Sequence, residues 1–134
     1  MKKIIILLIS IITVITTICI MGNIKDTIIF SGVLAEKNEE VEVRITRTFF
    51  DKVFNKMSEN MVVEGNNINY SYIFNRKIFD MERYYAAPIR RMDKSGLAAQ
   101  GYLYFDDKME NIVIQTEQEI IYSCEQDFFD MVTK

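Results

Sequence analysis

Histidine and tryptophan are both absent from this chain of 134 residues, which excludes several kinds of active site. Without histidine there is no Ser-His-Asp or Cys-His catalytic arrangement, and no zinc site with a histidine ligand. The five glycines form no glycine-rich phosphate-binding loop. General acid–base chemistry would therefore fall to carboxylates, lysine or tyrosine. The sequence predicts a protein that is not an enzyme and that holds no metal and no cofactor.

Cysteine is almost as scarce, with Cys19 in an apolar N-terminal segment and Cys124 near the other end of the chain. Beyond that segment the chain cannot form an internal disulfide, and a thiolate metal site is excluded as well. An exported domain without a disulfide fits a bacterial envelope better than a small secreted scaffold of animals. In the stretch IIYSCE, alternation places Cys124 on one face with Ile120 and Tyr122, which predicts a buried and unreactive thiol.

The N-terminus carries an uncharged run from Ile4 to Met21 behind Lys2 and Lys3. As a helix this run would span roughly 27 Å, close to the ~30 Å hydrocarbon core of a bilayer. The lysines before the run predict an N-terminus in the cytoplasm and the rest of the chain outside it. Residues 1–26 are therefore predicted to be a signal peptide or a signal-anchor that contacts the membrane through residues 4–21.

The sequence leaves three fates open for this segment. The run is longer than the apolar core of a typical secretory signal, and no Ala-x-Ala cleavage motif follows it, which favours an uncleaved anchor over a cleaved signal peptide. Lipidation of Cys19 is the third alternative. Cys19 is a weak candidate because Thr16 and Ile18 replace the aliphatic and small residues of a bacterial lipobox. All three fates predict a cell-membrane protein or a secreted protein whose residues 27–134 form one small extracytoplasmic domain.

Charge is unevenly distributed in the exported part of the chain. Residues 27–134 carry 13 Lys and Arg against 18 Asp and Glu, and this acidic balance argues against nucleic acid as a partner. Residues 76–94 are locally basic, whereas residues 106–134 are strongly acidic. The basic stretch is expected to be a solvated face, with contact to anionic lipid or to the acidic end of the chain as the alternatives.

Period-two alternation dominates residues 27–134. The stretch EVEVRIT places Val41, Val43 and Ile45 on one face and polar residues on the other, which is typical of a half-buried strand. Further strands are predicted at 27–34, 61–64, 68–74, 101–105, 111–116 and 119–124. The polar stretches between them, including Gly65 and Asn66, are suited to turns. We expect a mostly-β domain of six or seven strands, an antiparallel meander or small open barrel with one short helix.

One segment has helical spacing instead. In RTFFDKVFNKMSEN a helix over residues 49–57 is predicted, with Thr48 and Asp51 at its start. Its apolar residues are expected to form one buried stripe, made of Phe49, Phe50, Val53, Phe54 and Met57. The alternative fold is an α+β sheet with this helix packed on one face. A second short helix is predicted near the C-terminus, at residues 128–132.

Residues 86–98 are predicted to be the longest loop, because Pro88 cannot donate a ladder hydrogen bond. A binding surface is expected there and just before it, at Tyr84, Tyr85, Arg90 and Arg91. The function predicted is a non-enzymatic envelope protein of bacterial type that acts by binding or as a structural accessory, with an unknown protein or small molecule as its partner. The alternative function is a small-ligand carrier whose barrel pocket is lined by Tyr70, Tyr72, Phe74 and Tyr102.

Overall fold

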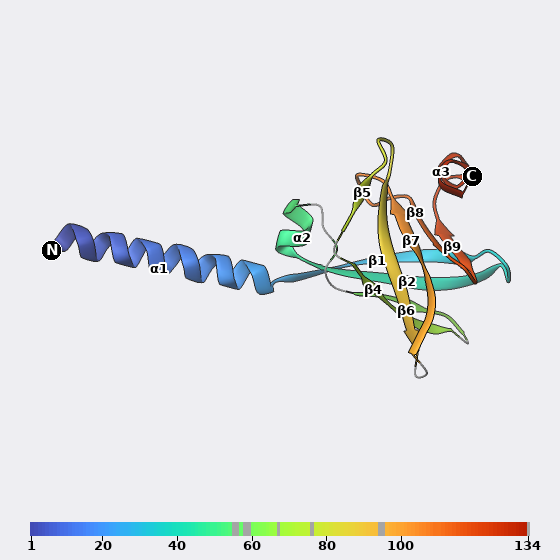
Figure 1. Ribbon diagram of the computed structural model, residues 1–134, viewed down its shortest axis with the longest axis horizontal. Helices are drawn as coiled ribbons and strands as arrows, with labels where there is room; N and C mark the ends of the chain where they lie inside the picture. Colours follow the sequence, from blue (N-terminus) through green and yellow to red (C-terminus); the bar gives the residue numbers. More distant parts are fainter. Residues whose placement is uncertain (55–56, 58–59, 67, 76, 94–95, 134) are drawn as a thin grey trace.

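The computed structural model describes residues 1–54, 57, 60–66, 68–75, 77–93 and 96–133. A long apolar helix, α1 (Lys2–Asn23), projects away from a small β barrel (Figure 1). The remaining elements, in chain order, are β1 (Lys25–Leu34), β2 (Glu39–Thr48), α2 (Phe49–Phe54), β3 (Asn60–Glu64), β4 (Asn69–Phe74), β5 (Phe79–Asp80), β6 (Tyr85–Asp93), β7 (Gly96–Phe105), β8 (Ile112–Thr116), β9 (Ile120–Ser123) and α3 (Gln126–Thr133). The predicted mostly-β fold behind an apolar N-terminal helix is confirmed.

Closure of the sheet distinguishes this structure from a simple meander. Consecutive strands pair antiparallel from β1 to β4 and from β5 to β9. Strand β4 pairs with β6 and β1 pairs with β9, so that eight of the nine strands in the described part of the chain form a closed ring. The ninth, β5, is two residues long and pairs with β6 beyond the end of β4. The seam between β1 and β9 is short, with Val33 opposite Tyr122 and Leu34 opposite Ile121. The barrel is thus closed rather than open, and it has more strands than the six or seven predicted.

The interior of the barrel is filled by large side chains. Val41, Val43 and Ile45 point inward, as their alternation predicted. Eight strands enclose a space just wide enough for side chains to fill. The largest fully buried members of the core are Tyr72, Phe105, Ile45, Met57, Met61, Ile89, Leu103, Ile112, Ile114, Ile121, Val43 and Val63.

The predicted loop at residues 86–98 is wrong over its described part, because residues 86–93 belong to β6 and residues 96–98 to β7, and the two strands pair antiparallel. Residues 94 and 95 lie outside the described residues. Pro88 is tolerated inside β6 because the partner strand is interrupted opposite it. The pairing of β4 ends with Phe74 opposite Ile89, and that of β5 begins with Phe79 opposite Ala86. The Pro88 carbonyl accepts a bond from the Asn75 N–H on that side at 3.3 Å. The missing N–H of Pro88 therefore faces the interruption and costs no ladder hydrogen bond.

Helix α2 is confirmed over residues 49–54, but its predicted buried stripe is wrong. Thr48 and Asp51 form a reciprocal capping box, in which each backbone N–H donates to the other side chain at 3.0 and 3.1 Å. Asp51 is therefore buried at 5 % exposure, whereas Val53 is 56 % and Phe54 63 % exposed. The helix lies beside β2 and the end of α1, outside the barrel wall, so its last residues have no core to enter. Met57 is buried, and residues 55 and 56 lie outside the described residues.

The second predicted helix is also present, as α3. It packs on the outer face of the barrel, where Phe128 and Val132 join Val113 in a second apolar cluster. Cys124 belongs to this cluster together with Ile120 and Tyr122, as alternation predicted. That shared face is the outer one, however, and Cys124 is half-buried rather than buried. Burial still raises the pKa of the Cys124 thiol, which keeps it protonated and slow to react.

Gly101 lies very close to the neighbouring strand β8. A Cβ at this position would lie 1.9 Å from the backbone oxygen of Gln115, whereas a Cβ at Gly32 would lie 3.2 Å from the Ile121 side chain. We expect Gly101→Ala to lower the free energy of unfolding by about 2–4 kcal/mol, because β8 must move to accept the methyl group. Gly32→Ala is the matched control and should cost less than about 1 kcal/mol. Denaturant melts of the full chain in mild detergent measure both, and equal losses would contradict the close approach.

Candidate functional site

Aromatic side chains gather on the outer face of β5, β6 and β7. They line a cavity of about 290 Å³, which we name the aromatic groove, made of Phe79, Met81, Tyr84, Ala86, Tyr102 and Tyr104. Strand alternation explains the arrangement, because Leu103 and Phe105 point into the core and the tyrosines between them point outward. Phe79, Met81 and Tyr102 are each more than one-third exposed, which is unusual for neighbouring large apolar groups.

The rings of the aromatic groove hold one another in place. Tyr102 stacks on Tyr104 with centroids 5.9 Å apart, and Tyr84 meets Tyr104 edge-on at 5.7 Å. Tyr84 also contacts Phe128 of α3, which ties the groove to the C-terminal helix. Burial raises the pKa of Tyr104, and the neighbouring hydroxyls of Tyr84 and Tyr102 add to this shift. The groove is therefore a preformed aromatic surface.

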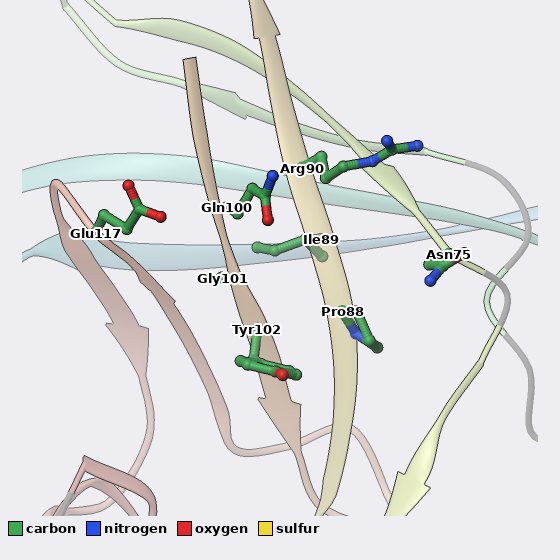
Figure 2. Close-up of a pocket in the computed structure, with 8 residues that line it drawn as sticks. All are labelled: Asn75, Pro88, Ile89, Arg90, Gln100, Gly101, Tyr102 and Glu117. Carbon is green, nitrogen blue, oxygen red and sulfur yellow. The ribbon is translucent and has the colours of Figure 1, made fainter. Parts of the chain in front are cut away.

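A second cavity adjoins the first through Tyr102. This polar groove, of about 500 Å³, is lined by Asn75, Pro88, Ile89, Arg90, Gln100, Gly101, Tyr102 and Glu117. Figure 2 shows Asn75 and Glu117 on opposite sides of the β6–β7 pair, with Tyr102 on β7 between them. The polar groove thus offers amides and charges of both signs next to an aromatic surface.

The four residues predicted as a binding surface lie on two faces of the barrel. Tyr84 lines the aromatic groove and Arg90 lines the polar groove. Tyr85 instead stacks on Phe105 at 5.4 Å, and a hydrogen bond with Asp107 raises its pKa. Arg91 is buried. The cause is the strand itself, since alternate residues of β6 point to opposite faces.

Arg91 lies in a cluster of polar side chains inside the barrel. Its Nη1 donates to Glu119 Oε1 at 2.9 Å, and the Tyr72 hydroxyl donates to the same oxygen at 2.8 Å. Arg91 Nη2 donates to the side-chain oxygen of Gln118, and the guanidinium lies 4.1 Å from the centre of the Tyr70 ring. Burial raises the pKa of Tyr72, and the charge of Glu119 adds to the shift, so Tyr72 stays protonated as a donor.

The partners of this buried cluster indicate a structural role. The carboxylate of Glu119 accepts two bonds and the guanidinium of Arg91 donates two, so both charges are compensated inside the barrel. Glu119 follows the turn between β8 and β9, and Tyr72 and Arg91 come from β4 and β6. Tyr72 and Arg91 are direct partners in the β4–β6 pairing, so the cluster ties this strand pair to the β8–β9 turn through Glu119.

Carboxylates outside this cluster also serve the fold. In the turn before β8, Asp106 accepts the Glu110 N–H at 2.8 Å and the Asn111 side-chain amide at 2.8 Å. Among the described residues, no group of three or more Cys, Asp or Glu is arranged to hold a metal ion. No family model, curated protein or solved structure matches this chain. The grooves and the apolar helix are therefore the features from which a function must be argued.

Sequence reasoning missed most of the groove. Phe79, Met81 and Glu117 were not singled out, and Tyr102 was assigned to an interior pocket with Tyr70, Tyr72 and Phe74. The structure places Tyr72 and Phe74 in the core and Tyr102 on the outer surface. The available signal was the alternation in GYLYF, where the inward Leu103 and Phe105 leave Tyr102 and Tyr104 outward.

The buried ion pair makes single and double substitutions behave differently. We expect Glu119→Leu to lower the free energy of unfolding by about 3–5 kcal/mol, because it leaves the Arg91 charge buried without its counter-charge. The double variant Arg91→Met with Glu119→Leu removes both charges and should lose clearly less than the single variant. Denaturant melts of these two variants and of Arg91→Met alone give the three values. A double variant that loses as much as the two single variants added together would show that the residues do not act as a pair.

Alkaline pH tests the role of Tyr72. The raised pKa means that the folded protein keeps this proton above pH 10, the ordinary tyrosine value, while the unfolded chain releases it. Tyr72 then stabilises the fold fully below pH 10, and its contribution falls by up to about 1.4 kcal/mol per pH unit above that value. Tyr72→Phe should flatten this part of the alkaline loss in urea melts. Tyr102→Phe, which removes an exposed hydroxyl, is the matched control. Identical alkaline slopes for Tyr72→Phe and the unmodified protein would contradict the assignment.

Proposed function

We propose that this protein is an extracytoplasmic binding protein, held on the membrane by α1, that recognises a partner protein through the aromatic and polar grooves. The observation that carries the proposal is the contrast between the two faces of the sheet. The inside of the barrel is filled by large apolar side chains and a compensated ion pair, whereas exposed aromatic residues gather in a groove on the outside. A filled barrel leaves recognition to its outer surface.

The residue types of the grooves favour a protein as the partner. Tyrosine, phenylalanine, methionine and arginine are the side chains enriched at protein interfaces, and tyrosine and arginine often dominate their energetics. The aromatic groove supplies the first three, and Arg90 lies in the adjoining polar groove. We infer that an apolar side chain of the partner enters the aromatic groove, while polar groups of the same segment meet Arg90 and Glu117.

The features of α1 support anchoring in a membrane. Its 22 residues form a helix that is long and apolar enough to cross a bilayer, and this helix projects away from the barrel with its C-terminal end beside α2 (Figure 1). The hydroxyls within the run do not need water, because Ser10, Thr13, Thr16 and Thr17 each donate to a backbone oxygen four residues earlier at 2.8–2.9 Å. Such internal bonds make these residues compatible with lipid.

Crosslinking in intact cells tests this proposal. A photoreactive amino acid at position 102 in the full chain should form an adduct with one protein, and the substitutions Phe79→Ser and Met81→Ser should reduce that adduct at least fivefold. The exposed Ile29 of β1, which lies outside both grooves, is the matched position for the control. Phe79 and Met81 are exposed, so their loss should leave the melting curve nearly unchanged.

The same cells test the compartment. Alkaline phosphatase fused to the C-terminus should be active, because the enzyme folds only outside the cytoplasm, and the fusion should remain with the membrane fraction. An inactive fusion would overturn the extracytoplasmic assignment. Equal crosslinking from positions 29 and 102, or an adduct insensitive to the Phe79 and Met81 substitutions, would overturn the assignment of the groove.

A further inference from the structure

The connection between α1 and the barrel is a single residue. Helix α1 ends at Asn23, β1 begins at Lys25, and Ile24 lies between them in an extended conformation. The Ile24 carbonyl accepts the Phe49 N–H at 3.0 Å, which joins the start of α2 to this connection. The Phe50 ring packs against Gly22, and a Cβ added to Gly22 would lie 2.9 Å from Cε2 of Phe50. Helix α2 is therefore fixed directly beside the end of α1 (Figure 1).

The outer side of α2 is apolar and exposed. Val53 and Phe54 are both more than half exposed, and so is Ile24 in the connection. The Phe54 ring stacks on Phe50 with centroids 6.3 Å apart, so it is held in place and not folded back against the barrel. Exposure of this surface to water would be unfavourable, since the free-energy cost of exposing apolar groups grows in proportion to the exposed area.

We propose that the exposed side of α2, made of Val53 and Phe54 with Ile24 beside it, inserts into the interfacial layer of the same bilayer that α1 crosses. We name these three residues the α2 collar. The inference rests on the proposed membrane anchoring by α1 and goes beyond it, because it adds a second contact with lipid and fixes the height of the barrel.

Geometry supports a lipid surface as the occupant. Twenty-two helical residues span about 33 Å, so a helix that crosses a ~30 Å hydrocarbon core brings its last turn to the interface. Gly22 belongs to that last turn, and the Phe50 ring lies against it. Because Phe54 stacks on Phe50, the α2 collar lies at the level where aromatic and aliphatic side chains of interfacial helices are buried.

The charges around the α2 collar suit the same position. Lys52 of α2 reaches Asp26 at 3.9 Å with its side chain largely exposed, and Lys25 and Arg47 lie at the same end of the β1–β2 hairpin. Long cationic side chains at a membrane surface bury their stems and keep their charges in the headgroup layer. Asp51, the acid within α2, is buried in the capping box and does not face the lipid.

The absence of tryptophan makes a direct test possible, because one substitution introduces a single fluorescent probe. The full chain is reconstituted in vesicles of phosphatidylcholine with a minority of phosphatidylglycerol, with phospholipids brominated near the glycerol or near the methyl end. Three variants are compared. Phe54→Trp probes the α2 collar, Ile12→Trp probes the middle of α1, and Lys37→Trp probes the turn after β1. That turn lies at the far end of a ten-residue strand from the connection, about 33 Å away.

We expect lipid brominated near the glycerol to quench Phe54→Trp at least threefold more effectively than lipid brominated near the methyl end. The emission of Phe54→Trp should also be blue-shifted. Ile12→Trp should be quenched best by bromine near the methyl end, and Lys37→Trp by neither lipid. Val53→Trp repeats the measurement on the same side of α2 and should behave as Phe54→Trp does.

Each other outcome decides against the α2 collar. If Ile12→Trp is quenched while Phe54→Trp stays as unquenched as Lys37→Trp, the collar is overturned and the anchor stands. A blue-shifted but unquenched Phe54→Trp would assign the surface to a protein contact, including a second copy of the chain. Quenching of Lys37→Trp as well would mean that the whole barrel lies on the lipid. An unquenched Ile12→Trp would overturn the anchor and the collar together.

Discussion

The pairing of β4 with β6 is the constraint on which the rest of the barrel depends, because it joins β1–β4 to β6–β9 in one sheet, which the β1–β9 seam then closes into a ring. Along one edge, strand β6 pairs with two different strands, with β4 at Ile89–Met92 and with β5 at Tyr85–Ala86. The interval between those partners is where Pro88 is accepted. On its other side β6 pairs with β7, whose Gly101 lets β8 approach closely. A proline thus stands where β6 changes partners, and a glycine stands where β8 lies very close to β7.

Closure also decides which side chains are available for recognition. Once the ring is complete, inward-facing residues must fill the interior, and a charged side chain there needs an opposite charge and hydrogen bonds that compensate it. Arg91 meets this requirement through Tyr72 of β4 and through Gln118 and Glu119, which both lie in the β8–β9 turn. Arg90, one residue earlier, faces solvent and remains available. The division between structure and recognition in this protein therefore follows the two faces of single strands.

Local patterns predicted the local structure well. The alternation of Val41, Val43 and Ile45, the cap made by Thr48 and Asp51, and the helical spacing near the C-terminus all correspond to observed elements. Each of these features depends on neighbours in sequence. The candidate site does not, because each groove takes its lining from several elements. Phe79, Arg90, Tyr102 and Glu117 come from β5, β6, β7 and the β8–β9 turn, and only the folded sheet brings these elements together. The loop predicted around Pro88 was wrong because the interruption opposite Pro88 belongs to another strand and cannot be read from the sequence near it. The core position predicted for Phe54 was wrong because the last turn of α2 lies beside α1 and not over the barrel interior.

The short seam between β1 and β9 has a consequence for how the protein is made. A chain synthesised from its N-terminus presents β1 first, and β2 to β8 can each pair with the strand before them or soon before them as they emerge. Strand β1 alone must wait for the last strand, so one of its edges stays bare through nearly the whole of synthesis. Bare edges invite pairing with other chains. Here the waiting edge begins directly after α1, and a membrane that retained the helix would keep nascent chains apart until β9 arrives.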